Sequence, residues 1–517
     1  MIEINPSRFK TRPFDHQLEG IKRLIAQPGF ALFDEMGSGK SYQVVTAAGL
    51  LHEAGELDCV LVIPPASCKS VWLNEEYGEI KKHSWVPSIV AEYHRTSYVR
   101  WADDAPAAAT LPWIVTNYEY LRSLNGLDHR RTGLEAVLKQ YRKVWMVLDE
   151  SSSIKSASSE QFKAVKELRQ LCSRCTLLNG TPVPNNPLDL WAQITVMDPQ
   201  VLGRHYKNFY HFRYTHCNFG GWRNKQIIGW RDLEKVQDYI APYCLRRLKR
   251  DCLDLPDKIG GIESSTPLLR EVKLTEATWR RYKRLRTEAI LSLPDTPDHL
   301  ETNGAVRLLR LAQLTSGHIS KQPIIEPPDD QVELFVEPEV EWTSDEKLRS
   351  TVEYLKEWST QEATVVWCRF RPERERLVKL LRNEGINTYE VYGGQKRDER
   401  EEAKRAFNPL SRGQGRRVLV AQPHAGGKGL DFSSSTEVLY QSSDWSLEWR
   451  LQSEDRSHRS GTVANVAYYE VLATGPDGQK TIDHTILNGL RKKQDLAAWT
   501  CAAWRKALQD EENADVF

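Results

Sequence analysis

The chain has 517 residues, with 71 Lys and Arg against 70 Asp and Glu, so its formal net charge is +1 at pH 7. This length exceeds what one hydrophobic core usually supports and predicts two or three domains. With 40% hydrophobic residues and no apolar run long enough to cross a bilayer, the composition favours a soluble globular protein and indicates no membrane partner. Because the overall charge is almost neutral, local basic patches would have to hold any polyanionic partner.

The nine cysteines are scattered along the chain, which is typical of free thiols in a reducing compartment. Cys172 and Cys175 form a C-x-x-C pair, but no second pair follows at metal-binding spacing, so we expect no zinc site. His205, His211, His216 and Cys217 crowd one segment, and loop or core positions are the better interpretation there. The first residues, MIEINPSRFK, show no signal peptide.

Apolar strands alternate with helical stretches in two parts of the chain, which predicts parallel sheets covered by helices. Between them, roughly residues 201–345, the sequence is aromatic and basic, then helical, and ends in a proline-rich acidic connector at 322–340. The expected fold is α/β, with two doubly wound parallel-sheet lobes and a mainly helical insert between them. The expected strands are 29–33, 59–63, 113–117, 144–150 and 176–180 in the first lobe, and 364–368, 388–392, 417–421, 437–441 and 465–473 in the second.

The segment FDEMGSGKSYQ (33–43) follows the first expected strand and precedes an amphipathic helix, the usual setting of a phosphate-binding loop. Gly37 and Gly39, with Ser38 between them, let backbone N–H groups turn toward a phosphate at the positive end of that helix. Lys40 would reach the β- and γ-phosphates of ATP, and the Ser41 hydroxyl would bind Mg²⁺. The loop opens with Asp34 where glycine is usual, and aspartate can also form the turn.

An acidic pair ends the buried strand VWMVLDE, about a hundred residues after the lysine. Asp149 and Glu150 are expected at the carboxyl edge of the sheet, facing the phosphate loop. Adjacent carboxylates can divide the chemistry, because Asp149 can hold Mg²⁺ while Glu150 orients or deprotonates the attacking water.

Several ordered motifs resemble the Swi/Snf-type ATPases, a branch of the superfamily-two helicases. DEMGSGKS (34–41) resembles their phosphate loop, with aspartate at its opening position, and DESSSIK (149–155) resembles their DEAH-like element. LNGTPVPNNPLDLW (178–191) is similar to their coupling motif, and APYCLRRLKRDCLDLPDK (241–258) to a block between their lobes. LLRLAQLTSGHI (308–319) is similar to a helix found near the annealing-helicase branch. The resemblance implies RecA-like lobes.

The second lobe continues the resemblance with AGGKGLDF (425–432), QSEDRSHRSG (452–461) and TIDHTIL (481–487). By this resemblance Gly429 and Asp431 contribute to nucleotide binding, and Gln452, Arg456 and Arg459 to catalysis. The two arginines are three residues apart, so on one helix they would share a face. The resemblance implies that they act as arginine fingers on the γ-phosphate. It also implies that Gln17, in PFDHQLEG, reads the adenine.

The family's usual track is double-stranded DNA, bound through its backbone without sequence preference. The residues that match its track-contacting motifs are Lys69, Asn117, Tyr118, Arg369 and Lys428. The basic runs at 246–250 and 280–286 are either further DNA contacts or solvated helix faces.

The sequence therefore predicts an ATP hydrolase that uses ATP and Mg²⁺ and moves along duplex DNA. A strand-separating, branch-migrating or annealing DNA helicase remains the alternative, and an RNA helicase is less favoured. The short flanks resemble a compact bacterial or phage motor, so a cytoplasmic, nucleoid-associated location is expected. The expected organisation is an ATP-binding lobe at 1–200, the insert at 201–345, a second lobe at 346–490 and a C-terminal helix and tail at 491–517.

Overall fold

The computed structural model describes most of the chain, in two compact units that divide the sequence between Leu253 and Asp254. The segment 201–345 therefore contributes to both units rather than forming one body, and most of the 322–340 connector lies outside the described residues. The described ranges are 2–74, 78–93, 109–121, 129–180, 182–183, 187–220, 226–291, 300–320, 340–359, 362–411, 413–426, 430–459 and 462–493.

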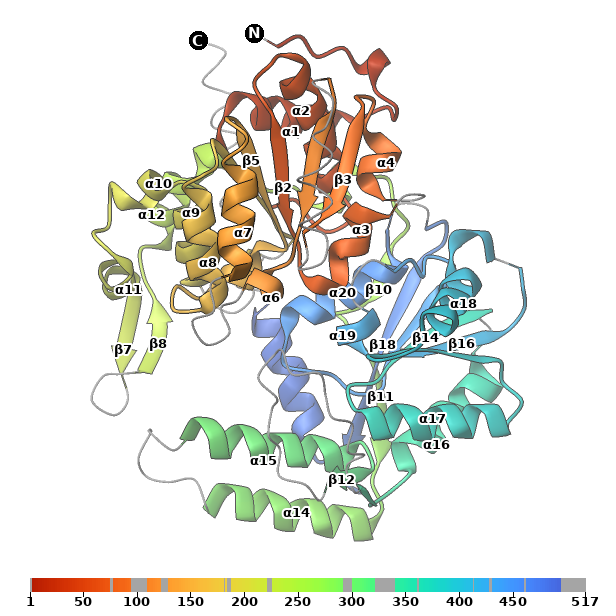
Figure 1. Ribbon diagram of the computed structural model, residues 1–517. Helices are drawn as coiled ribbons and strands as arrows, with labels where there is room; N and C mark the ends of the chain where they lie inside the picture. The colour runs from red at the N-terminus through yellow and green to blue at the C-terminus, as the bar shows by residue number, and fades with distance from the viewer. Residues whose placement is uncertain are drawn as a thin grey trace, which may run out of the picture. The chain divides into compact units, whose positions relative to one another are not determined.

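The described part of the first unit holds a parallel sheet with the strand order β3-β4-β2-β5-β6-β1-β9 (Figure 1). Its central strands are buried on both faces, which explains why they are almost continuously apolar. The strands are β1 (Gly29–Leu32), β2 (Cys59–Ile63), β3 (Ser88–Glu92), β4 (Leu111–Val115), β5 (Val144–Asp149), β6 (Arg174–Leu178) and β9 (Cys244–Leu245). The parallel sheet expected for this part is confirmed, and β3 and β9 are additions that the sequence analysis did not predict.

Helices cover both faces of this sheet and form two apolar clusters (Figure 1). One face packs against α1 (Asp15–Ala26), α2 (Lys40–Glu53) and α4 (Glu79–His83), and the other against α7 (His129–Leu138), α8 (Glu160–Arg169) and α9 (Asp189–Met197). The other helices are α3 (Lys69–Leu73), α6 (Tyr118–Leu121), α10 (Pro199–Gly203), α11 (Phe209–His216), α12 (Leu233–Ile240) and α13 (Lys249–Cys252), and β7 (Cys217–Gly220) pairs with β8 (Gln226–Trp230) as an antiparallel hairpin.

The described part of the second unit holds another parallel sheet, with the order β10-β18-β17-β14-β16-β15, and β11 also pairs with β18. β10 (Lys258–Gly260) and β11 (Leu268–Lys273) come from the expected insert, so that segment supplies strands as well as helices. The other strands are β14 (Ala363–Trp367), β15 (Thr388–Val391), β16 (Arg417–Ala421), β17 (Glu437–Tyr440) and β18 (Val466–Thr474), and β12 (His318–Ser320) pairs with β13 (Val340–Trp342) separately.

The helices of the second unit include the long pair α14 (Glu276–Leu291) and α15 (Leu300–Thr315), which pack against each other. The others are α16 (Glu346–Glu353), which continues into a π-helix (Tyr354–Trp358), and then α17 (Arg371–Asn383), α18 (Arg397–Phe407), α19 (Pro423–Gly426) and α20 (Leu447–Ser457). Helices of the described residues are all too short or too polar to span a membrane.

The C-x-x-C pair, His216 and Cys217 belong to the core, whereas His205 and His211 are exposed. Burial raises the pKa of Cys172 to about 12 and that of Cys175 to about 11. His216 is buried, with Nε2 2.6 Å from the Tyr206 hydroxyl and Nδ1 3.0 Å from the Arg231 carbonyl oxygen. These contacts satisfy the polar groups of His216 within the protein.

Candidate active site

The loop between β1 and α2 folds as a phosphate-binding loop. Gly37 and Gly39 have φ angles of 78° and 83°, a left-handed conformation that glycine adopts without steric cost. Gly39 is the last residue before α2, so Lys40 begins the helix. The Lys40 ammonium donates to the carbonyl oxygens of Asp34 at 2.7 Å and Glu35 at 3.2 Å, and the loop therefore wraps around the lysine side chain.

The donors of this loop fit a phosphate group. Backbone N–H groups at the start of a helix and a lysine ammonium are the usual ligands of nucleotide phosphates. The buried Ser38 hydroxyl has no hydrogen-bond partner among the described residues, which leaves one further polar group at the loop for a ligand. This arrangement fits ATP as the bound substrate.

Gln17, the expected adenine contact, packs directly on the loop from α1. Its Nε2 donates to the Ser38 carbonyl oxygen at 3.1 Å, and its Oε1 accepts from the Phe14 N–H at 3.0 Å. A Cβ atom at Gly39 would lie 2.3 Å from Gln17 Nε2, so a side chain there would displace the Gln17 amide and also strain the backbone at its φ of 83°. Gln17 is thus part of the loop's support in this structure.

The Asp34 side chain is held by Arg247, an arginine of the same unit that follows β9. Its carboxylate is fully buried and accepts hydrogen bonds from Arg247 Nε at 3.0 Å and Arg247 Nη2 at 2.5 Å. The neighbouring Arg246 donates to the carbonyl oxygens of Phe33 at 2.6 Å and Gly180 at 2.9 Å. The arginines at 246 and 247 therefore make contacts within the protein. In the same basic run, 246–250, Arg250 has an exposed side chain.

Replacing Arg247 with methionine should lower the free energy of unfolding of the first unit by about 3–5 kcal/mol, because it leaves the buried Asp34 carboxylate without its cation. Urea unfolding measures this value. Arg250→Met is the matched control, since that side chain is 75% exposed, and should stay within about 0.5 kcal/mol of wild type. Equal stability of the two variants would show that the buried pair does not hold the loop.

The acidic pair lies at the same sheet edge as the loop. Leu178 of β6 is in register with Leu32 of β1 on one side and with Asp149 of β5 on the other, so both strands end at the same level. Trp72 Nε1 donates to Asp149 Oδ2 at 2.9 Å and orients that carboxylate. Glu150 has a φ angle of 49°, a strained conformation for a residue with a side chain, and such strain clusters at functional sites.

Burial and three nearby carboxylates have opposite effects on the charge of the loop lysine. Burial lowers the pKa of Lys40 from its ordinary value, while the negative charges of Glu150, Asp34 and Asp149 oppose that shift and Arg246 adds to it. Mg²⁺ prefers oxygen ligands and is often bound by one or two carboxylates together with substrate phosphates. The Asp149 carboxylate and the Ser41 hydroxyl are ligands of that kind, so the residues present fit the ion.

A buried network joins the DESSS segment to the coupling motif. The Ser151 hydroxyl donates to Gln193 Oε1 at 2.6 Å, and Asn179 Nδ2 contacts the same oxygen at 3.4 Å. Gln193 Nε2 donates to the carbonyl oxygens of Pro182 and Asp189, both at 2.8 Å. Gln193, which was not among the expected site residues, therefore links the Ser151 hydroxyl to the 178–191 segment.

In the second unit, Arg456 and Arg459 converge on one backbone atom. The Nη1 atoms of both side chains donate to the Leu430 carbonyl oxygen at 3.2 Å, and Arg459 Nε lies 4.0 Å from an Asp431 carboxylate oxygen. α20 ends at Ser457, so Arg456 lies on the helix and Arg459 follows it. The structure nevertheless brings together the arginine motif and the 425–432 segment, although Gly429 and Lys428 lie outside the described residues.

α20 is fixed by buried charges that the sequence analysis did not identify. Glu454 is 1% exposed and contacts Lys258 and Arg450, the latter at 2.7 Å, while its Oε1 also accepts the Ile262 N–H at 3.0 Å. Burial alone would raise the pKa of Glu454, but Lys258 and Arg450 lower it to about 2. Gln452 is also fully buried on this helix, 3.3 Å from Glu448.

The expected DNA contacts differ in their surroundings. Tyr118 is buried and its hydroxyl donates to the Asp149 carbonyl oxygen at 3.0 Å, so its phenol supports the acidic pair. Lys69 pairs with Glu92, and buried Asn117 donates to Glu119 at 2.9 Å. Arg369 forms a 2.9 Å ion pair with Asp444.

Next to Arg369, Glu373 is a buried carboxylate with an unusual proton affinity. Its Oε2 accepts the Ser442 hydroxyl at 2.5 Å, and that hydroxyl also accepts the Arg369 N–H at 2.8 Å. Burial raises the pKa of Glu373 to about 7, and Lys347 only partly opposes the shift.

Glu373→Gln should therefore stabilise the second unit at pH 8 by up to about 3 kcal/mol and have little effect at pH 5. A carboxyl whose folded pKa is raised contributes its stability below the unfolded pKa near 4.5 and loses it as pH rises through about 7. Chemical denaturation at the two pH values measures the difference. A stability change independent of pH would contradict the raised pKa.

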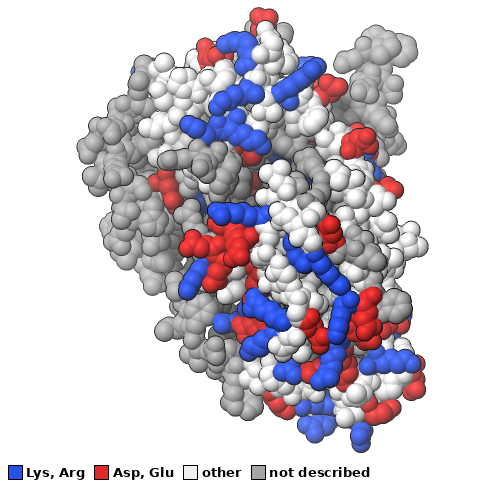
Figure 2. All heavy atoms as spheres, turned by 90° about the vertical axis from the view of Figure 1, so that its right-hand side faces the viewer, with Lys and Arg blue, Asp and Glu red and all other residues white. Residues whose placement is uncertain are grey.

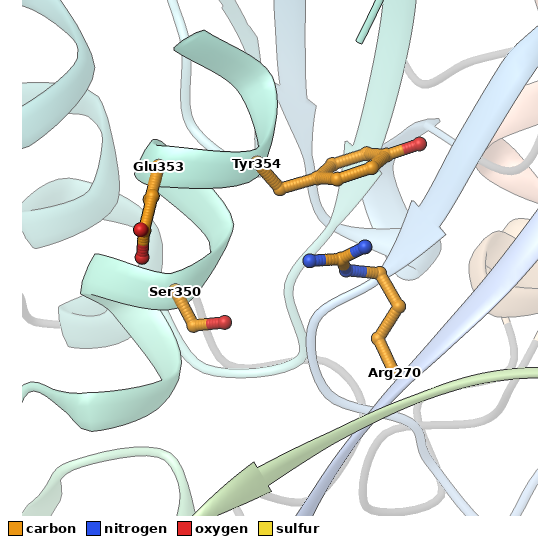
Figure 3. A pocket seen from close by; sticks show the side chains of 4 residues that line it. All are labelled: Arg270, Ser350, Glu353 and Tyr354. Carbon is orange, nitrogen blue, oxygen red and sulfur yellow. The ribbon is translucent and has the colours of Figure 1, made fainter. Parts of the chain in front are cut away.

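A pocket of about 410 Å³ lies elsewhere in this unit, between β11 and α16 (Figure 3). Arg270, Ser350, Glu353 and Tyr354 line it, and the Arg270 guanidinium carbon is 3.8 Å from the Tyr354 ring centroid. Tyr354 in turn donates to Glu437. None of the residues expected to bind ATP or DNA lines this pocket, so it is separate from the sites above.

Two family models match the chain. The SNF2-related domain matches residues 16–317, which is more than half of the chain, and the helicase conserved C-terminal domain matches residues 346–461. The matches contain the phosphate loop, the acidic pair and both arginines.

Several curated proteins are similar over most of the chain. SWI/SNF-related matrix-associated actin-dependent regulator of chromatin subfamily A member 1 of Homo sapiens is 25% identical over 509 residues, covering 93% of this chain and 43% of the relative. DNA annealing helicase and endonuclease ZRANB3 of Bos taurus is 22% identical, and the match covers 99% of this chain and 42% of the relative. An uncharacterized ATP-dependent helicase of Mycoplasma pneumoniae is 24% identical, and the match covers 97% of this chain and 44% of the relative. The chain thus spans less than half the length of these relatives.

Among solved structures, the Sulfolobus solfataricus SWI2/SNF2 ATPase core in complex with dsDNA is 22% identical, covers 91% of this chain and 90% of its own, and has a TM-score of 0.40. The family assignment rests on the two domain matches, which together contain the ordered motifs. The chain belongs to the SNF2-related family of helicase-type ATPases.

Proposed function

We propose that this chain couples ATP hydrolysis to movement along double-stranded DNA, which it binds through the backbone without sequence preference. The observation that carries the proposal is the shared sheet edge of the first unit, where the Lys40 loop and the Asp149–Glu150 pair follow strands that end in register on the two sides of β6. A phosphate loop beside a pair of carboxylates supports hydrolysis of a nucleoside triphosphate.

In this proposal each residue has a defined task. The Gly37–Ser41 loop binds the phosphates, Gln17 binds the adenine, and Glu150 takes a proton from the attacking water. Ser41 and Asp149 would hold Mg²⁺. The chemistry supplied by the bound ion is neutralisation of charge on the β- and γ-phosphates.

The second unit supplies arginines for the same substrate. Arg456 and Arg459 would stabilise the charge that develops on the γ-phosphate in the transition state, with Gln452 and Asp431 beside them. Their convergence on the Leu430 carbonyl supports a common task, because one backbone atom positions both guanidinium groups.

A DNA track is supported by the family and by the printed name of one relative, the DNA annealing helicase. Within the described residues, Lys69 and Arg369 each pair with a carboxylate, so DNA phosphates would compete with Glu92 and Asp444 for them. That relative's name also favours strand annealing as the second candidate function.

ATP turnover measured without polymer and with duplex DNA, single-stranded DNA, forked DNA and RNA tests the proposal. We expect duplex DNA to stimulate hydrolysis most, and the stimulation to fall with salt as counterions compete for the phosphate contacts. Equal stimulation by RNA would remove the DNA assignment. Stimulation by forked DNA alone would favour strand separation or annealing.

A further inference from the structure

One segment of the first unit has a net positive charge, whereas the chain as a whole is almost neutral. From residue 199 to residue 231 the sequence has no Asp or Glu. Figure 2 shows the usual pattern, with acidic and basic side chains interspersed on the face in view. The basic residues of the segment are Arg204, Lys207, Arg213, Arg223, Lys225 and Arg231, of which Arg223 and Lys225 lie outside the described residues.

This segment folds into α11 and the β7–β8 hairpin, which lie together beyond α10 and α12 in the first unit (Figure 1). Tyr210 and Tyr214 lie one turn apart on α11 and are 74% and 72% exposed, more than any other aromatic side chain in the described ranges. Two large rings so open to solvent indicate a binding surface.

The opposite side of α11 is anchored, so the surface is preformed. Phe212 is fully buried and packs 5.1 Å from Trp191, measured between ring centroids. The Asn208 side chain caps the helix by accepting the His211 N–H at 2.9 Å. Arg231 on the hairpin side donates to the carbonyl oxygens of Tyr214 at 2.7 Å and Thr215 at 2.8 Å, which fixes the last turn.

Cationic and aromatic side chains lie close together in this segment. The Arg213 guanidinium carbon lies 5.2 Å from the Phe219 ring centroid, and the Tyr214 ring lies 5.8 Å from the same centroid. Lys207 is exposed just before the helix. Exposed rings interleaved with cations bind single-stranded nucleic acid, because unpaired bases stack on the rings while the cations contact phosphates.

We propose that α11 and the β7–β8 hairpin bind an unpaired DNA strand, with Tyr210 and Tyr214 stacking on bases and Lys207 contacting a phosphate. The occupant is a single strand because bases within a duplex have both faces covered by their neighbours. This site is additional to the duplex track and depends on the proposed function only in taking DNA as the polymer.

Fluorescence anisotropy with labelled oligo(dT), and with a duplex of equal length, tests the stacking contact without ATP. In Tyr210→Ala/Tyr214→Ala we expect oligo(dT) to bind at least about ten-fold more weakly, since each stacked base contributes substantially. Tyr210→Phe/Tyr214→Phe is the matched control and should retain binding, because phenylalanine keeps the ring face. The urea midpoint of the alanine variant should match that of wild type, since both rings are exposed.

The salt dependence separates stacking from phosphate contact. Lys207→Gln should reduce the slope of log K against log salt for oligo(dT) by about 0.7, the value for one phosphate contact on a single strand. The tyrosine double variant should weaken binding and leave the slope unchanged. Lys163→Gln, an exposed lysine on α8, is the control and should change neither quantity.

Three results would contradict the proposed single-strand site. They are unchanged oligo(dT) affinity in the alanine variant, equal loss of oligo(dT) and duplex affinity, and tighter binding of oligo(U) than of oligo(dT). None of these measurements involves ATP hydrolysis, so failure here is distinguishable from failure of duplex DNA to stimulate turnover in wild type.

Discussion

Lys40→Ala is expected to abolish ATP hydrolysis and weaken ATP binding. Lys40 would contact the β- and γ-phosphates, and in the structure its ammonium also holds the Asp34 and Glu35 carbonyl oxygens of the loop. Its removal therefore takes away a charge at the phosphates and a support of the loop. Steady-state turnover and fluorescent-nucleotide binding measure the two effects.

Glu150→Gln is the companion to Lys40→Ala, because it removes a proton acceptor and keeps the size of the side chain. We expect this variant to bind ATP and fail to turn it over, with a loss on the order of 10²–10⁴, the usual contribution of a general base. Full turnover in Glu150→Gln would exclude Glu150 as the base. Loss of binding in both variants would instead indicate a damaged loop.

Arg459→Ala should lower DNA-stimulated turnover by on the order of 10² or more while ATP affinity changes little. Arginine fingers contribute about 10³–10⁵ in rate by stabilising charge that develops in the transition state. Arg456→Ala should behave similarly, because both side chains are positioned by the Leu430 carbonyl. Nucleotide binding and hydrolysis are measured side by side for each variant.

The matched control for these arginines is Arg349→Ala, whose side chain is 76% exposed and forms a 3.5 Å surface ion pair. Its turnover should stay within about a factor of two of wild type, since exposed pairs contribute little. Near-normal hydrolysis in both Arg456→Ala and Arg459→Ala would contradict a role at the γ-phosphate.

The sequence predicted the parallel sheets and the positions of the motifs because both depend on short-range patterns. Apolar runs such as Cys59–Ile63 identify buried strands, and the glycines at 37 and 39 identify the phosphate loop. β9 and β10 are only two and three residues long, and β11 (LLREVK) has one leucine exposed and one partly buried, so the apolar pattern gave no clear signal for them.

Contacts between distant residues could not be predicted in this way. Asp34 and Arg247 are separated by 213 positions, and the need of Asp34 for a cation partner follows from its burial, which only the fold reveals. Tyr118 follows a strand, as an exposed contact residue would, yet its ring fills the core and its hydroxyl reaches Asp149. Whether such a residue is an exposed contact or part of the core depends on its burial, and burial depends on the whole fold.

Displacement of a fluorescent third strand from a DNA triplex tests most directly whether this chain moves along duplex DNA. The third strand is bound ahead of the protein on an unbroken duplex, so it leaves only if a motor travels through the site. We predict displacement that requires ATP and is lost in Glu150→Gln and Arg459→Ala. Duplex-stimulated hydrolysis with no displacement by the wild-type protein would contradict the account.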